Sequence, residues 1–550
     1  MIPLIPAPLH LETREGEPYQ LAAGATIVAP PDLDAVAAWF TSELERLTGL
    51  FLTIGSGEGA IRLVLDATDP KLANLPTPAG VRADNGDPAA ERHALAIDAD
   101  GVRITGATPE GVLRGVVSLL QIAATGSRNP DGTILLPLVS IADAPRFAWR
   151  GLSLDVVRRA FPVEEVKQVI DLLALYKANV LHLHLTDSEG WRIEIDAWPK
   201  LTEVAGQTAA NNRPGLFYTK ADFAGLVQYA ADRFITIVPE IEMPGHTAAI
   251  FRSYPELAGD GETTGGDVMT KSHHLQTMDP DNPRIVPFIA DVLTEVAAMT
   301  PGGYLHIGGD EALGMDGDQY RRFMQEVKQI VGRLGKNVVA WQETARSGFA
   351  PGDIAQLWIS PNQGQPEALD LDTADLPEGF ELPADGEQVL VAFAEFLKLA
   401  NADLDAALGQ GAHILVSQQS RCYLDTKYRE GSSDPAQAAD HHRLGMPFYP
   451  KSTVTEFYDW DPATVRPQLT EANIAGIEAA IWCETIESFA DACFLLLPRL
   501  PGVLEKGWSA AGGGARTWED YAPRLSAQAS IWDACGWPWF RSEVVWRGDA

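Results

Sequence analysis

The chain has 550 residues, of which 46% are hydrophobic, so it can bury a large core, and its length favours more than one domain. Its 75 acidic and 42 basic side chains give a formal net charge of −33, which argues against nucleic acid or an anionic membrane as a partner. There is no run of about 18 apolar residues that would predict a transmembrane helix, and no basic n-region of a secretory signal, so we expect a cytoplasmic protein.

The first part of the chain alternates helix-like and strand-like stretches. A hairpin turn at Asp100-Gly101 joins two of the strands, and Thr108 is a plausible N-cap for the second helix. This pattern predicts a small α+β domain over residues 1–146. Its expected helices are residues 32–47 and 108–123, and its expected strands are residues 60–67, 93–99, 101–107 and 134–145.

From residue 147 to residue 550, short β-rich runs recur with helical stretches between them. Eight strands that alternate with helices predict a closed (β/α)8 TIM barrel, an α/β fold, and most runs end in a charged or aromatic residue. The ends of barrel strands form the active-site face. The runs are residues 149–156, 179–187, 235–243, 304–311, 337–343, 354–360, 412–418 and 476–484. An acidic insertion rich in Pro and Gly, residues 360–388, could be an ordered excursion or a mobile lid.

Two acids, Asp310 and Glu311, stand side by side at the end of the fourth run, "YLHIGGDE". Most glycosidases use two carboxyl groups on opposite sides of the scissile bond, roughly 5–9.5 Å apart. Neighbours in sequence can hardly occupy such positions, so the pair needs a different chemistry.

The segments "RGLSLDVVRR", "HLHLTDSEGWRIEI", "PEIEMPGH" and "HIGGDE" together resemble the family 20 glycoside hydrolases, the β-N-acetylhexosaminidases. The resemblance runs almost end to end. It implies an exo-acting enzyme that removes terminal GlcNAc or GalNAc with retention and needs no cofactor or metal. In this family the 2-acetamido group of the substrate is the nucleophile, so one acid protonates the leaving oxygen and the other stabilises an oxazolinium ring. The resemblance makes Glu311 the acid/base and Asp310 the acetamido partner.

The resemblance also assigns substrate-binding residues around this pair. Arg158, three residues after Asp155, would grip the 3- and 4-hydroxyls, Asp187 would lie near the site, and His246 would support the acids. Tyr423 would contact the acetamido oxygen. Asp425 and Glu484 would bind sugar hydroxyls, and tryptophans at strand ends would pack against the sugar: Trp341, Trp358 and Trp482.

Three departures from the family pattern have effects that the sequence leaves open: Arg159 where His is usual, Ser188-Glu189 for Asp-Gln, and Glu242 for Asp. The four cysteines show no metal-ligand spacing and are expected to be free thiols.

Three alternatives remain at this point. Glu484 could be a covalent nucleophile opposite Glu311. His182 and His184, with His246 and Asp310, could bind zinc in a metal-dependent hydrolase. The chain could also be a silent sugar-binding protein. GlcNAc against GalNAc preference, the natural substrate and the oligomeric state stay open.

Overall fold

The computed structural model describes residues 2–57, 59–258, 276–313, 315–360, 386–510 and 517–546, without the side chains of residues 386–392 and 401. Most of the acidic insertion, residues 361–385, lies outside the described residues. Among the helices of the described part, none combines the length and the apolar character that a membrane span requires.

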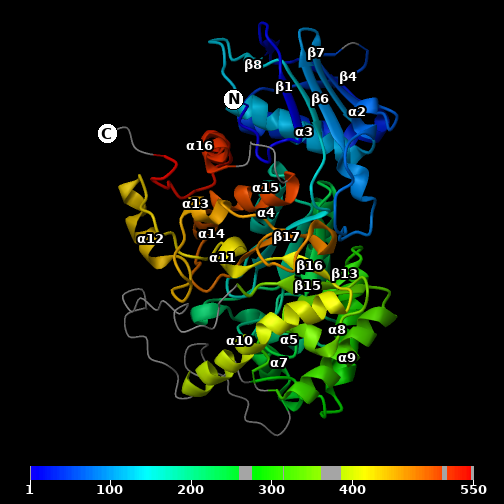
Figure 1. Ribbon diagram of the computed structural model, residues 1–550, viewed down its shortest axis with the longest axis vertical. Helices are drawn as coiled ribbons and strands as arrows, with labels where there is room; N and C mark the ends of the chain where they lie inside the picture. The colour runs from blue at the N-terminus through cyan, green and yellow to red at the C-terminus, as the bar shows by residue number, and fades with distance from the viewer. Residues whose placement is uncertain are drawn as a thin grey trace.

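The N-terminal domain is built on a seven-stranded mixed sheet with the order β1-β9-β6-β7-β5-β3-β4. Figure 1 shows it at the top of the molecule, in blue and cyan, with α3 (Pro109–Thr125) between the sheet and the rest of the chain. The predicted hairpin is present, because Asp98 pairs with Gly101. The strands are β1 (His10–Thr13), β3 (Thr26–Val28), β4 (Thr53–Gly55), β5 (Ile61–Leu65), β6 (His93–Asp98), β7 (Gly101–Gly106) and β9 (Val139–Asp143).

The two predicted helices are present as α1 (Asp34–Thr48) and α3. The Thr108 side chain caps α3 by accepting a hydrogen bond from the backbone N–H of Gly111. One predicted strand was wrong. Residues 134–145 form two strands, β8 (Ile134–Leu136) and β9, because Pro137 cannot donate to a ladder; β8 pairs instead with β2 (Tyr19–Leu21).

All eight predicted barrel strands are present, and they close into a parallel barrel in which β17 pairs with β10. Helices of the connecting segments pack on its outside, among them α4 (Val163–Leu175), α6 (Lys220–Ala231), α8 (Ile285–Met299), α9 (Gly317–Arg333), α10 (Gly386–Gly409) and α15 (Arg499–Trp508) (Figure 1). The strands are β10 (Trp149–Asp155), β11 (Val180–His184), β12 (Thr236–Glu240), β13 (Tyr304–His306), β14 (Asn337–Trp341), β15 (Ile354–Leu357), β16 (His413–Val416) and β17 (Ile474–Ile481).

A segment of the N-terminal domain covers the end of the barrel where the strands begin. The backbone N–H of Val81 donates to the carbonyl of Ala475, and that of Gly303 donates to the carbonyl of Ala83. Ala83 also packs in a hydrophobic cluster with residues near the beginnings of the barrel strands. Gly80 permits this approach, since a Cβ there would lie 2.0 Å from the carbonyl oxygen of Ala475. The opposite end of the barrel, at the C-terminal ends of the strands, is where a functional site is expected.

Candidate active site

The acid pair sits on a sharply turned loop after β13. Gly308 and Gly309 have φ values of +62° and +103°, in the region that favours glycine. A Cβ on Gly308 would lie 1.9 Å from Oε1 of Glu242. Glu311 itself has a φ of +43°, which is strained for a residue with a side chain. The backbone of this loop is therefore held in an unusual conformation by the packing around it, and this fixes the positions of the two carboxyl groups.

Asp310 is mostly buried, and one of its carboxyl oxygens, Oδ1, has no hydrogen-bond partner among the described residues. Burial raises the pKa of Asp310 to about 6, although the charge of His246 opposes the rise. The Glu242 carboxyl hydrogen-bonds to Asp310. Glu242 Oε1 accepts the backbone N–H groups of Met243 and Gly309, and burial beside Asp310 raises the pKa of Glu242 well above its usual value. The raised pKa favours the neutral form of Glu242, the form that can donate a hydrogen bond to the Asp310 carboxylate.

His246 lies between the acid pair and Asp187. Its Nε2 is 3.6 Å from Oε2 of Glu311 and 3.8 Å from Oδ2 of Asp310, and its Nδ1 is 3.2 Å from Oδ1 of Asp187. Asp187 raises the pKa of His246 well above its usual value despite burial. The charged form of the imidazole is therefore favoured, and the structure places it beside both acids.

Arg158 is held by three carboxyl groups. Its Nη2 is 2.7 Å from Asp187, its Nη1 is 3.5 Å from Asp155, and its Nε is 3.2 Å from Glu189. The neighbouring Arg159 has different contacts, because it pairs with Glu165 at 2.7 Å and lies over the Phe161 ring. Of the two arginines, Arg158 is the one beside the predicted site residues.

Two further acids of the site, Asp425 and Glu484, have buried carboxyl oxygens. Both carboxyl oxygens of Asp425 and Oε2 of Glu484 are buried without a hydrogen-bond partner in the part of the chain that the structure describes. Burial raises the pKa of each. The charge of Glu484 adds to the rise at Asp425, whereas at Glu484 Arg158 opposes the rise and Asp155 adds to it. Buried polar atoms are nearly always paired, so these oxygens are suited to ligand hydroxyls.

Aromatic rings line the same region. The Trp482 ring lies 6.0 Å from that of Trp341 and 5.9 Å from that of Tyr423, and the Arg158 guanidinium lies 5.4 Å from it. Trp341 donates its indole N–H to Glu240 at 3.0 Å. Trp358 donates to Glu343 at 2.9 Å. These indoles are fixed by buried carboxylates, so their faces have defined positions.

Two residues near the acids were missed by the sequence reasoning. Tyr449 packs 6.1 Å from the Tyr423 ring, and the charges of Asp425, Glu484 and Glu311 raise its pKa. It belongs to a loop with no strand-end pattern, so nothing in the sequence signals it. Glu343, whose pKa is raised well above its usual value by burial and by Asp310, does end the fifth predicted run and could have been found there.

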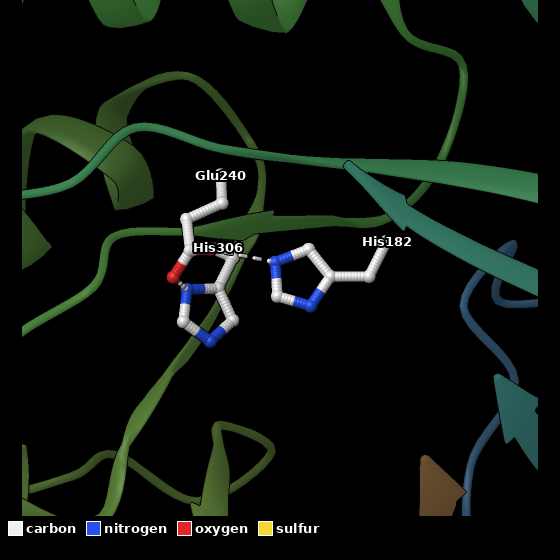
Figure 2. Close-up of side chains that lie close together, drawn as sticks. All are labelled: His182, Glu240 and His306. Carbon is white, nitrogen blue, oxygen red and sulfur yellow. Dashed lines mark hydrogen bonds and ion pairs between the residues drawn. The ribbon is translucent and has the colours of Figure 1, made fainter. Parts of the chain in front are cut away.

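The predicted alternative of a zinc site concerns the histidines of β11. His182, Glu240 and His306 lie close enough to hold an ion, as do His184, Glu240 and Glu242; neither set contains both His182 and His184 or includes His246 or Asp310. Figure 2 shows Glu240, His306 and His182 close together; the Glu240 carboxylate lies 3.1 Å from His182 and 2.7 Å from His306.

The hydrogen bonds of these histidines do not favour metal binding. His182 contacts Glu240 and Glu478 through its two ring nitrogens, and His184 contacts Glu240 and Asp187. Despite burial, these carboxylates raise the pKa of His182 to about 9 and that of His184 to about 10. A metal needs a neutral imidazole with a free lone pair, whereas both rings are doubly hydrogen-bonded cations.

Two family models match this chain. The catalytic domain of glycosyl hydrolase family 20 matches residues 147–374 and 386–511, and domain 2 of the same family matches residues 1–144. A β-N-acetylhexosaminidase of Cellulomonas fimi is 36% identical over 100% of this chain and 98% of its own length.

Solved structures of β-N-acetylhexosaminidases are similar to this chain over nearly its whole length. The N-acetyl-β-hexosaminidase of Streptomyces plicatus, in complex with thio-NAglucal, has a TM-score of 0.80 and 34% identity over 99% of this chain and 97% of its own. The β-N-acetylhexosaminidase of Streptomyces coelicolor A3(2) gives 0.80 and 34% over 99% of this chain and 98% of its own. The chain belongs to glycosyl hydrolase family 20.

Proposed function

We propose that this protein is an exo-acting β-N-acetylhexosaminidase that removes terminal GlcNAc or GalNAc from β-linked glycosides with retention, through a cyclic oxazolinium intermediate. Its relatives support the activity: the Cellulomonas fimi protein carries this name, and a variant of the Streptomyces plicatus enzyme is described in complex with its product GlcNAc.

The single observation that carries the mechanism is the position of the acid pair. Both carboxyl groups approach the same atom, Nε2 of His246, within 3.8 Å. They therefore lie on one side of the reacting sugar, where an ordinary pair would lie on two. One acid can act on the leaving oxygen while its neighbour acts on the acetamido group.

In the first step, Asp310 accepts the acetamido N–H through its unpartnered Oδ1 and orients the carbonyl oxygen toward the anomeric carbon. That oxygen attacks, and Glu311 gives its proton to the leaving oxygen. Positive charge develops on the cyclic intermediate and is stabilised by the Asp310 carboxylate, which Glu242 and His246 hold in place.

In the second step, Glu311 takes a proton from water, which attacks the anomeric carbon from the side that the leaving group vacated. The bond from that carbon to the acetamido oxygen breaks, the ring opens, and the acetamido group is restored. Two inversions give net retention. Arg158, Asp425 and Glu484 bind the hydroxyls of the terminal sugar, and the indoles exclude water from the cation.

The alternative in which Glu484 is a covalent nucleophile is less consistent with its surroundings. Burial raises the pKa of Glu484, which favours its neutral form, and a nucleophile must be ionised.

The test is a panel of p-nitrophenyl glycosides. The β-N-acetylglucosaminide or β-N-acetylgalactosaminide should be cleaved, with the β-anomer of the sugar as the first product by NMR, and the β-glucoside should hardly react. Equal cleavage of the glucoside, or release of the α-anomer, would rule the proposal out.

A further inference from the structure

Three carboxyl groups surround the Arg158 guanidinium, one close to each of its nitrogens. A guanidinium has five N–H donors, one on Nε and two on each terminal nitrogen. Asp155 and Asp187 each contact one terminal nitrogen, and Glu189 contacts Nε. One N–H on each terminal nitrogen therefore remains for a ligand, which suits two neighbouring hydroxyls.

Glu189 differs from the two aspartates in how it is anchored. Asp155 accepts the backbone N–H groups of Val157, Arg158 and Cys483. Asp187 is hydrogen-bonded by His184, His246 and Ser188. Glu189 is only 5% exposed. Its Oε2 lies 3.2 Å from Nε of Arg158, yet neither atom has a hydrogen-bond partner in the described part of the chain, so this close contact lacks hydrogen-bond geometry.

Asp187 also acts on the Glu189 carboxyl, and a hydrogen bond between the two side chains helps to raise the pKa of Glu189. Two carboxyl groups can share a hydrogen bond only if one of them carries a proton. Arg158 and His246 lower the pKa of Asp187 well below its usual value, so the proton belongs to Glu189.

The charges around Glu189 support this assignment. Burial raises its pKa to about 8; Arg158 opposes the rise, whereas Asp187 and Glu484 add to it. Two further arginines interact electrostatically with it: Arg192, and Arg252 on α7 (Ala248–Ser253). At neutral pH the side chain is a neutral acid, and at alkaline pH it becomes an anion beside two other acids.

We infer that Glu189 is a proton-bearing positioning residue: as a neutral acid it donates to Asp187 and steadies Arg158 at Nε, and its deprotonation weakens binding of the terminal sugar. The inference rests on the proposed function, because Arg158 is there the residue that binds the sugar hydroxyls. Through the proton on Glu189, sugar binding by Arg158 would depend on pH.

The test compares E189Q and E189A with the wild type on p-nitrophenyl β-N-acetylglucosaminide between pH 6 and pH 9.5. Glutamine keeps a donor for Asp187 and an acceptor for Arg158 but cannot ionise. E165Q is the matched control, since Glu165 pairs with the neighbouring Arg159.

In the wild type and in E165Q, KM should rise as the pH passes about 8, with a smaller change in kcat. In E189Q, KM should match the wild type at pH 6 and stay flat to higher pH. E189A should raise KM roughly tenfold at every pH, the scale of a lost hydrogen bond to a charged group. Calorimetric binding of GlcNAc to the wild type and E189Q should show the same divergence without turnover.

An alkaline rise in KM and in the GlcNAc dissociation constant that is identical in the wild type and E189Q would overturn the inference, as would a wild-type KM in E189A. Failure of the proposed function looks different, because then the wild type would not release p-nitrophenol at pH 6 while the GlcNAc titration still reports on Glu189.

Discussion

The Nε2 atom of His246 lies 3.6 Å from Oε2 of Glu311, and the opposite ring nitrogen contacts Asp187. Because Asp187 raises the pKa of the imidazole and favours its charged form, a positive charge lies beside the acid pair.

Glu311→Gln should remove the proton donor and leave the sugar-binding residues in place. General acid–base assistance is worth roughly 10²–10⁴-fold in rate. The loss of kcat/KM should be large for poor leaving groups and small for 2,4-dinitrophenol, which needs little protonation. Equal losses across a series of aryl leaving groups would contradict the role of Glu311.

Arg158→Ala should raise KM and lower kcat together, because a grip on two hydroxyls stabilises both the ground state and the transition state. Arg159→Ala is the matched control, since that side chain pairs with Glu165 and lies over Phe161. Steady-state kinetics of both variants check this. A collapse in Arg159→Ala with normal kinetics in Arg158→Ala would reverse the assignment.

The strand ends of the barrel could be predicted from the sequence because buried parallel strands are short apolar runs. The last residues of these strands all lie at the same end of the barrel. Asp310, Glu311 and Glu484 were found in this way. Tyr449 could not be, because it reaches the acids from a loop whose path depends on tertiary packing. The contact of Glu189 with Arg158 could not be predicted either, because it joins the loops that follow two different strands, β10 and β11.

The rate should depend on pH through Asp310. The ionised form is the one that stabilises the cation, and burial raises the pKa of this carboxyl to about 6. The kcat of the wild type should therefore fall as the pH drops through about 6. A kcat that stays constant from pH 7 to pH 4.5, with the fold intact by circular dichroism, would contradict this.

The same raised pKa has a consequence for stability. Since the folded state binds this proton more tightly than the unfolded state, ionisation of Asp310 destabilises the fold as the pH rises from about 4 to about 6. Asp310→Asn should raise the Tm at pH 8 and change it little below pH 4. A lower Tm in the variant at pH 8 would mean that the carboxylate stabilises the fold.

Tyr449→Phe should raise KM by roughly 2- to 10-fold, the scale of one hydrogen bond, because the charges of Asp425, Glu484 and Glu311 act on its hydroxyl. Tyr229→Phe is the control: that hydroxyl donates to Asp171 on the outer helices. If the two variants have the same KM, Tyr449 does not contact the substrate.

The central claim is that the substrate supplies the nucleophile, and the most direct measurement of it is kcat/KM for p-nitrophenyl glucosaminides whose N-acetyl group carries zero, one, two or three fluorines. Each fluorine withdraws electrons from the acetamido oxygen without touching Asp310 or Glu311. If that oxygen attacks the anomeric carbon, kcat/KM should fall steeply at every step of the series. A rate that is insensitive to fluorination would contradict the account and indicate that a carboxylate of the protein is the nucleophile.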